Sequence, residues 1–387
     1  MKLISPILMF LAIVSSVGAQ ELKFRHELPS DTQFAKRTIR FSPDTNGDLQ
    51  ADVYRPAGAK GRLPIFLFMN AVGKQLGPVL FRDHPQYAGW GRAATLVGVA
   101  GIVMESDGKN SLQNFDQLIG YLQKNAEQLG VDADQVIVFS CSANVKIGMP
   151  VITDPRRAYI RGGVVYYGNG EVGSFRHDVP VLVVRAGMDA ESLNRGLDEV
   201  VARAVNENAP WTLINISGGN HGFDVFDDNE ESREVISQTL AFVKRAVDPK
   251  FRQALLARQQ KAQASGLAYA KKFPEAATAY QQLLAANPKD DVAHWKLAQV
   301  LAQQGQHRQA IEHFQAALDL GNMNRGFISM AAAKSAMAIE DRDTALNFIE
   351  RLKGIDVITS QLMSIPEFEP LHGDPRFQAV VTTARGK

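Results

Sequence analysis

The feature that most constrains the fold of this chain is a series of short apolar runs separated by longer, helix-like segments. Unbroken runs of this length suit strands that are buried on both faces of a parallel sheet. We expect helices between them, and the pattern as a whole predicts an α/β domain with a mostly parallel sheet. The runs lie at residues 64–69, 102–105, 136–139, 163–167, 179–184 and 212–216, and the helix-like segments at about 87–97, 112–129, 142–152, 190–208 and 230–247.

Two earlier runs, at residues 37–42 and 49–55, also have the composition of strands. Asp44, Thr45, Asn46 and Gly47 lie between them, and residues of these types are typical of a tight turn. We therefore expect a hairpin at the beginning of the sheet.

The segment VIVFSCSAN, residues 136–144, predicts a nucleophile at a sharp turn after a buried strand. Such a turn is strained and tolerates little bulk two residues to either side of its centre. Centring it on Ser142 places Ser140 and Asn144 there, whereas centring it on Cys141 or Ser140 would place a Phe or a Val at the crowded position. The usual pattern is Gly-x-Ser-x-Gly, and here both glycines are replaced. The alternative interpretation is a serine that caps a buried helix.

Two more polar residues follow later apolar runs. His221 lies in GGNHGFD, where flanking glycines let the loop bring the ring close to another turn. Asp189 follows the run at 179–184, and its alternative role is to cap the helix predicted over 190–208. Asp224 and Asp227 are fallback candidates for the carboxylate, although both are expected at the start of the next helix.

Ser142, Asp189 and His221 occur in the order Ser, Asp, His, each after a predicted strand. With this order, residues 52–247 resemble the α/β-hydrolase superfamily, and the HGFD segment resembles its dienelactone-hydrolase-like branch. The stretches DVYRPAG, GVAGIVMESD and LGVDADQVIVFSCSAN also carry the resemblance. Dienelactone hydrolases have a cysteine nucleophile, whereas this chain has serine. The resemblance therefore implies an α/β-hydrolase fold that hydrolyses an ester or related acyl bond rather than the lactone of the branch's namesake.

Each of the three residues has an expected role in that chemistry. His221 would accept the proton of Ser142 during attack and return it to the leaving group, a task suited to imidazole because its ordinary pKa lies near neutrality. Asp189 would hold His221 in the right tautomer and stabilise the imidazolium. Acyl transfer needs no cofactor beyond these groups.

The developing oxyanion also requires hydrogen-bond donors. The expected pair is the backbone amide of Ala143, directly after the nucleophile, and an amide of Ala71 or Val72, between which the sequence does not choose. These two lie in MNAVG, where many relatives have a His-Gly-Gly run. The altered glycines at the turn and in this loop leave open the hypothesis that catalysis is weak or lost.

Cysteine and histidine usage limits the other chemistries. Cys141 is the one cysteine of the chain, so no intrachain disulfide forms, and we expect its side chain to point into the core as a small hydrophobe. The eight histidines are scattered, so no metal site is predicted, and no Gly-rich phosphate signature occurs. A formal net charge of +1 gives no electrostatic reason to expect nucleic acid as a partner.

The first residues predict export. Lys2 precedes an apolar run over residues 3–14, and small residues follow as far as Ala19. This is the pattern of a signal peptide over residues 1–19, with an apolar run too short to span a bilayer. We expect a periplasmic or secreted protein without a stable membrane span after cleavage; a retained membrane anchor is the alternative.

Beyond residue 247 the composition changes, with Ala and Gln in place of β-branched runs. The step from Ala276 to Ala310 is 34 residues, and a looser copy begins at Ala345, 35 residues further. This period resembles tetratricopeptide repeats. We expect residues 248–250 to form a linker, residues 251–387 a helical repeat domain, and residues 362–377 its cap. The repeats either bind a protein partner in a groove or form a compact helical appendage that shields or dimerises the first domain.

The sequence thus predicts an exported serine hydrolase with a catalytic domain over residues 20–247 and a C-terminal repeat domain. Its substrate would be a small molecule or acyl ester. The alternative is a degenerate hydrolase fold that serves as a protein-interaction scaffold through the repeats.

Overall fold

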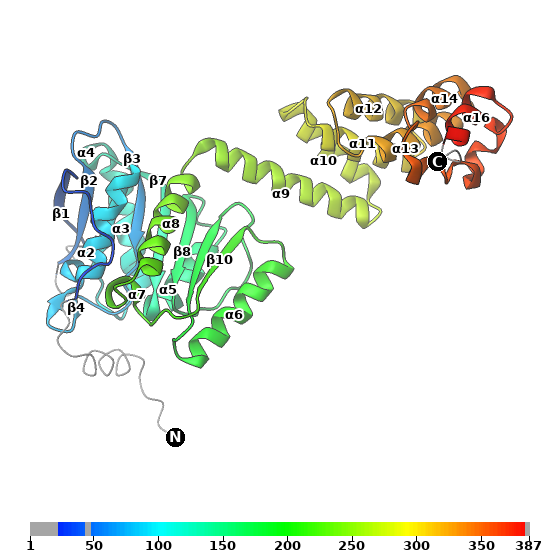
Figure 1. The fold of residues 1–387 in the computed structure, drawn as a ribbon. Helices are drawn as coiled ribbons and strands as arrows, with labels where there is room; N and C mark the ends of the chain where they lie inside the picture. The colour runs from blue at the N-terminus through cyan, green and yellow to red at the C-terminus, as the bar shows by residue number, and fades with distance from the viewer. Residues whose placement is uncertain (1–21, 43–47, 384–387) are drawn as a thin grey trace. The chain divides into compact units, whose positions relative to one another are not determined.

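The computed structural model describes residues 22–42 and 48–383, so the predicted signal peptide and the turn at 44–47 lie outside the described residues. The chain divides into two compact units, Met1–Gln253 and Ala254–Lys387 (Figure 1). Within the part of the chain that the structure describes, no helix is both long enough and apolar enough to cross a membrane.

The first unit is built on an eight-stranded sheet with the order β1-β2-β6-β3-β7-β8-β9-β10 among the described residues. β2 pairs antiparallel with both β1 and β6, and every later pair is parallel. This arrangement confirms the mostly parallel sheet and is that of the α/β-hydrolase fold. The strands are β1 (Phe34–Ser42), β2 (Leu49–Pro56), β3 (Leu63–Phe68), β6 (Ala100–Met104), β7 (Val131–Cys141), β8 (Ile160–Tyr166), β9 (Val181–Ala186) and β10 (Trp211–Ile216).

Helices cover both faces of this sheet, as the unbroken apolar strands require. One apolar core joins the sheet to α3 (Ser111–Lys124), α5 (Val145–Thr153) and α6 (Glu191–Asn206). The other joins it to α2 (Pro85–Ala94) and α8 (Glu230–Ala246). Figure 1 shows these helices flanking the strands.

Three local features differ from the sequence prediction. The helix expected over 112–129 is interrupted at Asn125, which separates α3 from the short α4 (Ala126–Leu129). A small hairpin, β4 (Gln75–Leu76) and β5 (Val79–Leu80), lies after β3 and was not predicted. Residues 249 and 250 form no linker, because α9 (Pro249–Tyr269) begins there, with proline at a helix start where its missing N–H costs nothing.

The second unit is all helical. The alanines that mark the repeat, Ala276, Ala310 and Ala345, are each fully buried, which places small residues where paired helices touch. The segment predicted as a cap also contributes to this core, through Leu362 and Phe377 among others. The elements are α10 (Phe273–Ala286), α11 (Asp291–Gln303), α12 (His307–Asp319), α13 (Arg325–Met337), α14 (Arg342–Glu350), α15 (Asp356–Thr359), η4 (Leu362–Ser364), η5 (Pro366–Leu371) and α16 (Pro375–Thr383).

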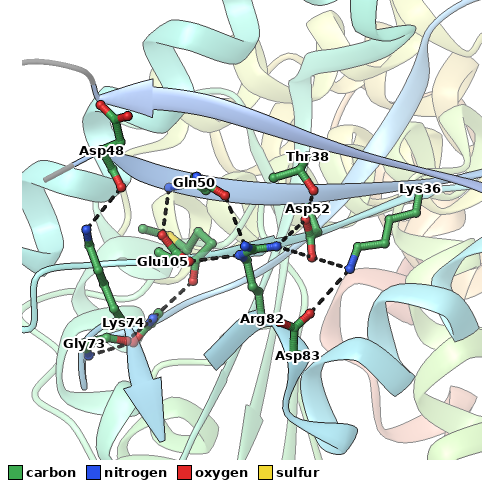
Figure 2. Close-up of polar contacts among 12 residues, drawn as sticks. Lys36, Thr38, Asp48, Gln50, Asp52, Gly73, Lys74, Arg82, Asp83 and Glu105 are labelled. Carbon is green, nitrogen blue, oxygen red and sulfur yellow. Dashed lines mark hydrogen bonds and ion pairs between the residues drawn. The ribbon is translucent and has the colours of Figure 1, made fainter. Parts of the chain in front are cut away.

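A cluster of charged side chains ties the segment after β3 to the antiparallel side of the sheet (Figure 2). Arg82 donates from Nη1 to Asp52 at 3.1 Å and from Nε to Glu105 at 2.9 Å. The Asp52 side chain is fully buried and also accepts from Thr38 at 2.7 Å and pairs with Lys36 at 2.8 Å. Buried carboxylates need such partners, because an unpaired buried charge is costly.

Replacing Arg82 by methionine should therefore destabilise the first unit by about 3 kcal/mol, since Asp52 and Glu105 would lose their shared partner inside the protein. The free energy of unfolding can be measured by urea denaturation with tryptophan fluorescence. A Trp295→Phe background limits the signal to Trp90 and Trp211, which both belong to the first unit.

Arg156→Met is the matched control, because the Arg156 side chain is 87% exposed in its pair with Asp154. A pair with so exposed an arginine contributes little to stability, because water screens the charge. Equal losses of stability in the Arg82 and Arg156 variants would show that the buried cluster has no special structural role.

Candidate active site

Ser142 lies at the turn between β7 and α5, in the short 3-10 helix η3 (Ser142–Asn144). Its φ is 53°, in the left-handed region that is strained for any residue with a side chain. Two glycines make room for this turn. A Cβ on Gly148 would lie 2.2 Å from Ser140 Oγ, and one on Gly168 would lie 2.5 Å from Ser142 O. The close approaches are thus relieved by glycines on neighbouring segments rather than by glycines next to the serine.

The structure brings Ser142, His221 and Asp189 together. Ser142 Oγ lies 2.8 Å from His221 Nε2, and His221 Nδ1 lies 2.7 Å from Asp189 Oδ2. A carboxylate only accepts, so Nδ1 carries the proton in the neutral ring and Nε2 presents its lone pair to the serine hydroxyl. The side chains of His221 and Asp189 are 11% and 5% exposed, which shields this contact from water.

The three residues follow β7, β9 and β10 at the carboxyl ends of parallel strands, where ligands and polar side chains gather in open α/β sheets. Asp189 is not the helix cap that its position also suggested: the N-cap of α6 is Ala190, and the Asp189 carboxylate accepts from the Ala190 amide at 2.7 Å. Asp227, one of the two fallback candidates for the carboxylate, accepts a hydrogen bond from Asn220 N at 2.8 Å.

Asp224 forms a separate polar cluster. Its fully buried carboxylate accepts hydrogen bonds from Tyr167 Oη at 2.7 Å, Trp90 Nε1 at 2.8 Å and Gln86 Nε2 at 3.0 Å. Burial raises the pKa of the Asp224 carboxyl group. The Tyr167 ring lies 4.8 Å from the His221 ring, measured between centroids, so the cluster supports the imidazole from one side.

Sequence reasoning missed the partners of Asp224. Gln86, Trp90 and Tyr167 come from α2 and from the end of β8, and no local motif marks them. The available signal was Asp224 itself, a carboxylate in an otherwise apolar stretch three residues after His221.

The amides that we expected as oxyanion donors differ in their availability. Ala71 N donates to Asn144 Oδ1 at 2.7 Å, and Val72 N donates to Asn70 Oδ1 at 2.9 Å. Both are therefore already hydrogen bonded to side chains in this structure. Ala143 is the second residue of η3, a position where helix geometry leaves the amide without an intrahelical acceptor.

Two cavities are lined in part by α5 and by residues that follow β3 or β8, and neither lining includes Ser142, Asp189 or His221. One cavity of about 690 Å³ is lined by Ala71, by Ile147 of α5 and by residues 108–113 before and within α3. Ala71 lies in the loop after β3, residues 70–73, which we call the oxyanion loop. The other, of about 730 Å³, is lined by Lys146 of α5, residues 169–172 after β8 and part of α6. Each has the size of a small-molecule site. Among the described residues, no group of three or more His, Cys, Asp or Glu side chains is arranged to hold a metal ion.

Cys141 is buried in the aromatic core, with its sulfur 3.5 Å from Tyr87 Oη. This agrees with the expected inward orientation. Burial, with a smaller contribution from the Asp224 charge, raises the pKa of the thiol to about 12. The thiolate is the reactive form, so this side chain is a poor nucleophile at neutral pH.

We therefore expect the folded protein to resist alkylation of Cys141 by iodoacetamide at mildly alkaline pH, and the urea-unfolded protein to react fully. Intact mass measurements in both states provide the test. Rapid alkylation of the folded protein would contradict the burial and the raised thiol pKa.

Residues 261–322 match the tetratricopeptide repeat family model, so the second unit contains such a repeat. No curated protein matches the chain.

Several solved structures that resemble the chain are hydrolases. The α/β hydrolase MGS-M1, from a Medee basin deep-sea metagenome library, is 12% identical and aligns over 55% of this chain and 98% of its own, with a TM-score of 0.46. Carboxyl esterase 2 of the fungus Tuber melanosporum is 15% identical, over 64% of this chain and 100% of its own, with a TM-score of 0.46. A protein of Klebsiella pneumoniae classed as a dienelactone hydrolase is 16% identical, over 55% and 98%, with a TM-score of 0.42. This similarity is one of fold only and assigns no activity to this chain.

Proposed function

We propose that this chain is an exported serine hydrolase that cleaves an ester or related acyl bond with Ser142, His221 and Asp189. The observation that carries the proposal is the continuous line of hydrogen-bond contacts from Ser142 Oγ through His221 to Asp189, at 2.8 and 2.7 Å. A hydroxyl, an imidazole and a carboxylate in this order form a nucleophile, its base and the group that orients the base.

In acylation, Ser142 Oγ forms a bond to the substrate carbonyl carbon while His221 Nε2 takes the hydroxyl proton. The carbonyl electron pair moves onto oxygen, and the amide of Ala143 donates a hydrogen bond to that oxyanion. The carbon–oxygen bond to the leaving group then breaks, and the leaving group takes the proton from Nε2. Asp189 stabilises the imidazolium between these steps.

Deacylation repeats the sequence with water. His221 removes a proton from the water as it attacks the acyl carbon, and then returns a proton to Ser142 Oγ as the acid leaves. All the groups needed are side chains and amides of this chain, so the reaction requires no cofactor. The cavity of about 690 Å³ that Ala71 lines has the size of a small-molecule site and is the candidate for the part of the substrate nearest the expected oxyanion donors.

A second function rests on a specific observation, the hydrogen-bonded state of the Ala71 and Val72 amides. A site short of oxyanion donors suits a degenerate hydrolase fold, with the tetratricopeptide repeats recruiting a protein partner. The aligned serine, histidine and carboxylate favour the enzyme, because a scaffold has no need to keep them in contact. Export, directed by the signal peptide predicted over residues 1–19, belongs to either function.

A fluorophosphonate probe should label the wild-type protein, and Ser142→Ala should abolish the labelling because the probe is attacked by Oγ. His221→Ala should slow it at least about a thousandfold, since the hydroxyl loses its base. Gel fluorescence and intact mass over time give the rates.

Ser140→Ala is the matched control. Ser140 is fully buried two residues before the nucleophile, and its hydroxyl has no hydrogen-bond partner within the described part of the chain, so labelling should persist at the wild-type rate. Labelling that survives in Ser142→Ala would reject the nucleophile, and a wild type that never reacts would favour the scaffold.

A further inference from the structure

Asn144 stands two residues after the nucleophile, where the usual pattern has glycine, and its side chain contacts the oxyanion loop. Its Oδ1 accepts the Ala71 amide at 2.7 Å, a short and well-formed hydrogen bond. Glycine has no group that could do this. Asn144 therefore occupies the Ala71 amide, one of the main-chain groups that we expected to donate to the oxyanion.

The Asn144 side chain is fixed in this position. It is 2% exposed, and its Nδ2 donates to Tyr87 Oη at 3.2 Å and lies 3.9 Å from Cys141 Sγ. Rotating it away from Ala71 would break the contact with Tyr87 and leave buried polar atoms without partners, which is unfavourable.

The oxyanion loop is equally fixed on its own side. Asn70 is fully buried and accepts from Val72 N at 2.9 Å and Gly73 N at 3.2 Å, while it donates to Gly73 O at 2.8 Å and Met104 O at 3.1 Å. Both oxygen and nitrogen of this amide group are thus fully used. These bonds keep the Val72 amide from turning toward a substrate, but none of them involves the Ala71 amide, which donates to Asn144 Oδ1.

We propose that Asn144 is a specificity-determining residue that leaves the site with the Ala143 amide as its main-chain oxyanion donor, and that the enzyme therefore favours activated esters. This inference rests on the proposed function. Losing one oxyanion donor costs on the order of 10²–10³ in rate. Activated esters, such as aryl esters and thioesters, lose less, because their good leaving groups depart with less charge built up on the carbonyl oxygen. Alkyl esters and amides depend on that charge being stabilised.

The test is the ratio of kcat/KM for phenyl acetate to that for ethyl acetate, which share an acyl group and differ in the leaving group. It is measured on the full mature chain and on two variants, Asn144→Gly and Asn144→Ala. Both remove the Oδ1 that holds Ala71 N. Asn144 has a φ of −68° and a ψ of −22°, ordinary helical values that alanine adopts without strain, so the alanine variant guards against a folding loss in the glycine variant.

We expect both variants to hydrolyse ethyl acetate at least about tenfold faster relative to phenyl acetate than the wild type does, because the freed Ala71 amide adds a second donor. Asn125→Ala serves as the matched control. Asn125 also makes a side-chain hydrogen bond, to Tyr121 O at 2.8 Å, but it lies between α3 and α4, so its loss should leave the ratio unchanged.

An unchanged ratio in stably folded Asn144 variants of an active enzyme would overturn the inference and leave the proposed function standing. An equal fall in kcat/KM for both esters would overturn the inference as well, since Asn144 would then support catalysis rather than limit it. A wild-type protein that hydrolyses neither ester and resists the fluorophosphonate would overturn the proposed function, and the inference with it.

Discussion

The parallel pairing of β7, β8, β9 and β10 is the constraint on which the candidate site depends. The register sets Cys141 beside Tyr166 and continues evenly across the next strands, so their carboxyl ends finish at one edge of the sheet. Ser142, Asp189 and His221 follow these ends within a few residues. A slip of one residue in any pair would turn the side chains of that strand to the opposite face. Residues from remote parts of the chain therefore meet because of backbone hydrogen bonds that involve none of their side chains.

Around the site, glycines outside the usual motif and buried polar side chains replace the glycines of that motif. The strained turn at Ser142 is accommodated by Gly148 and Gly168, which lie outside the motif. Asn144 occupies a position where glycine is usual and Asn70 one where many relatives have histidine, and both accept hydrogen bonds from main-chain amides of the loop after β3. Such groups fix a loop strongly, because an unpaired polar atom in the interior is costly. The same bonds that order the oxyanion loop also occupy its amides.

The fold could be predicted well from the sequence because both of its signals are local patterns along the chain. Unbroken apolar runs indicated the strands, and the 34-residue step between alanines indicated the repeats. The positions of Ser142, Asp189 and His221 followed from strand ends. The sequence could not predict that the amides of the oxyanion loop are already hydrogen bonded. The bond between Ala71 and Asn144 joins residues 73 positions apart and depends on side-chain orientation. The partners of Asp224 were missed for the same reason. The interruption of the helix at Asn125, whose side chain donates to Tyr121 O at 2.8 Å, was not predicted either.

The central claim is that Ser142, His221 and Asp189 form one working unit. A crystal structure of the protein after reaction with a phosphonate inhibitor tests it most directly. We expect continuous density from phosphorus to Ser142 Oγ, with the His221 ring still between the adduct and Asp189. An adduct on another side chain, or an imidazole turned away from both Ser142 and Asp189, would contradict it.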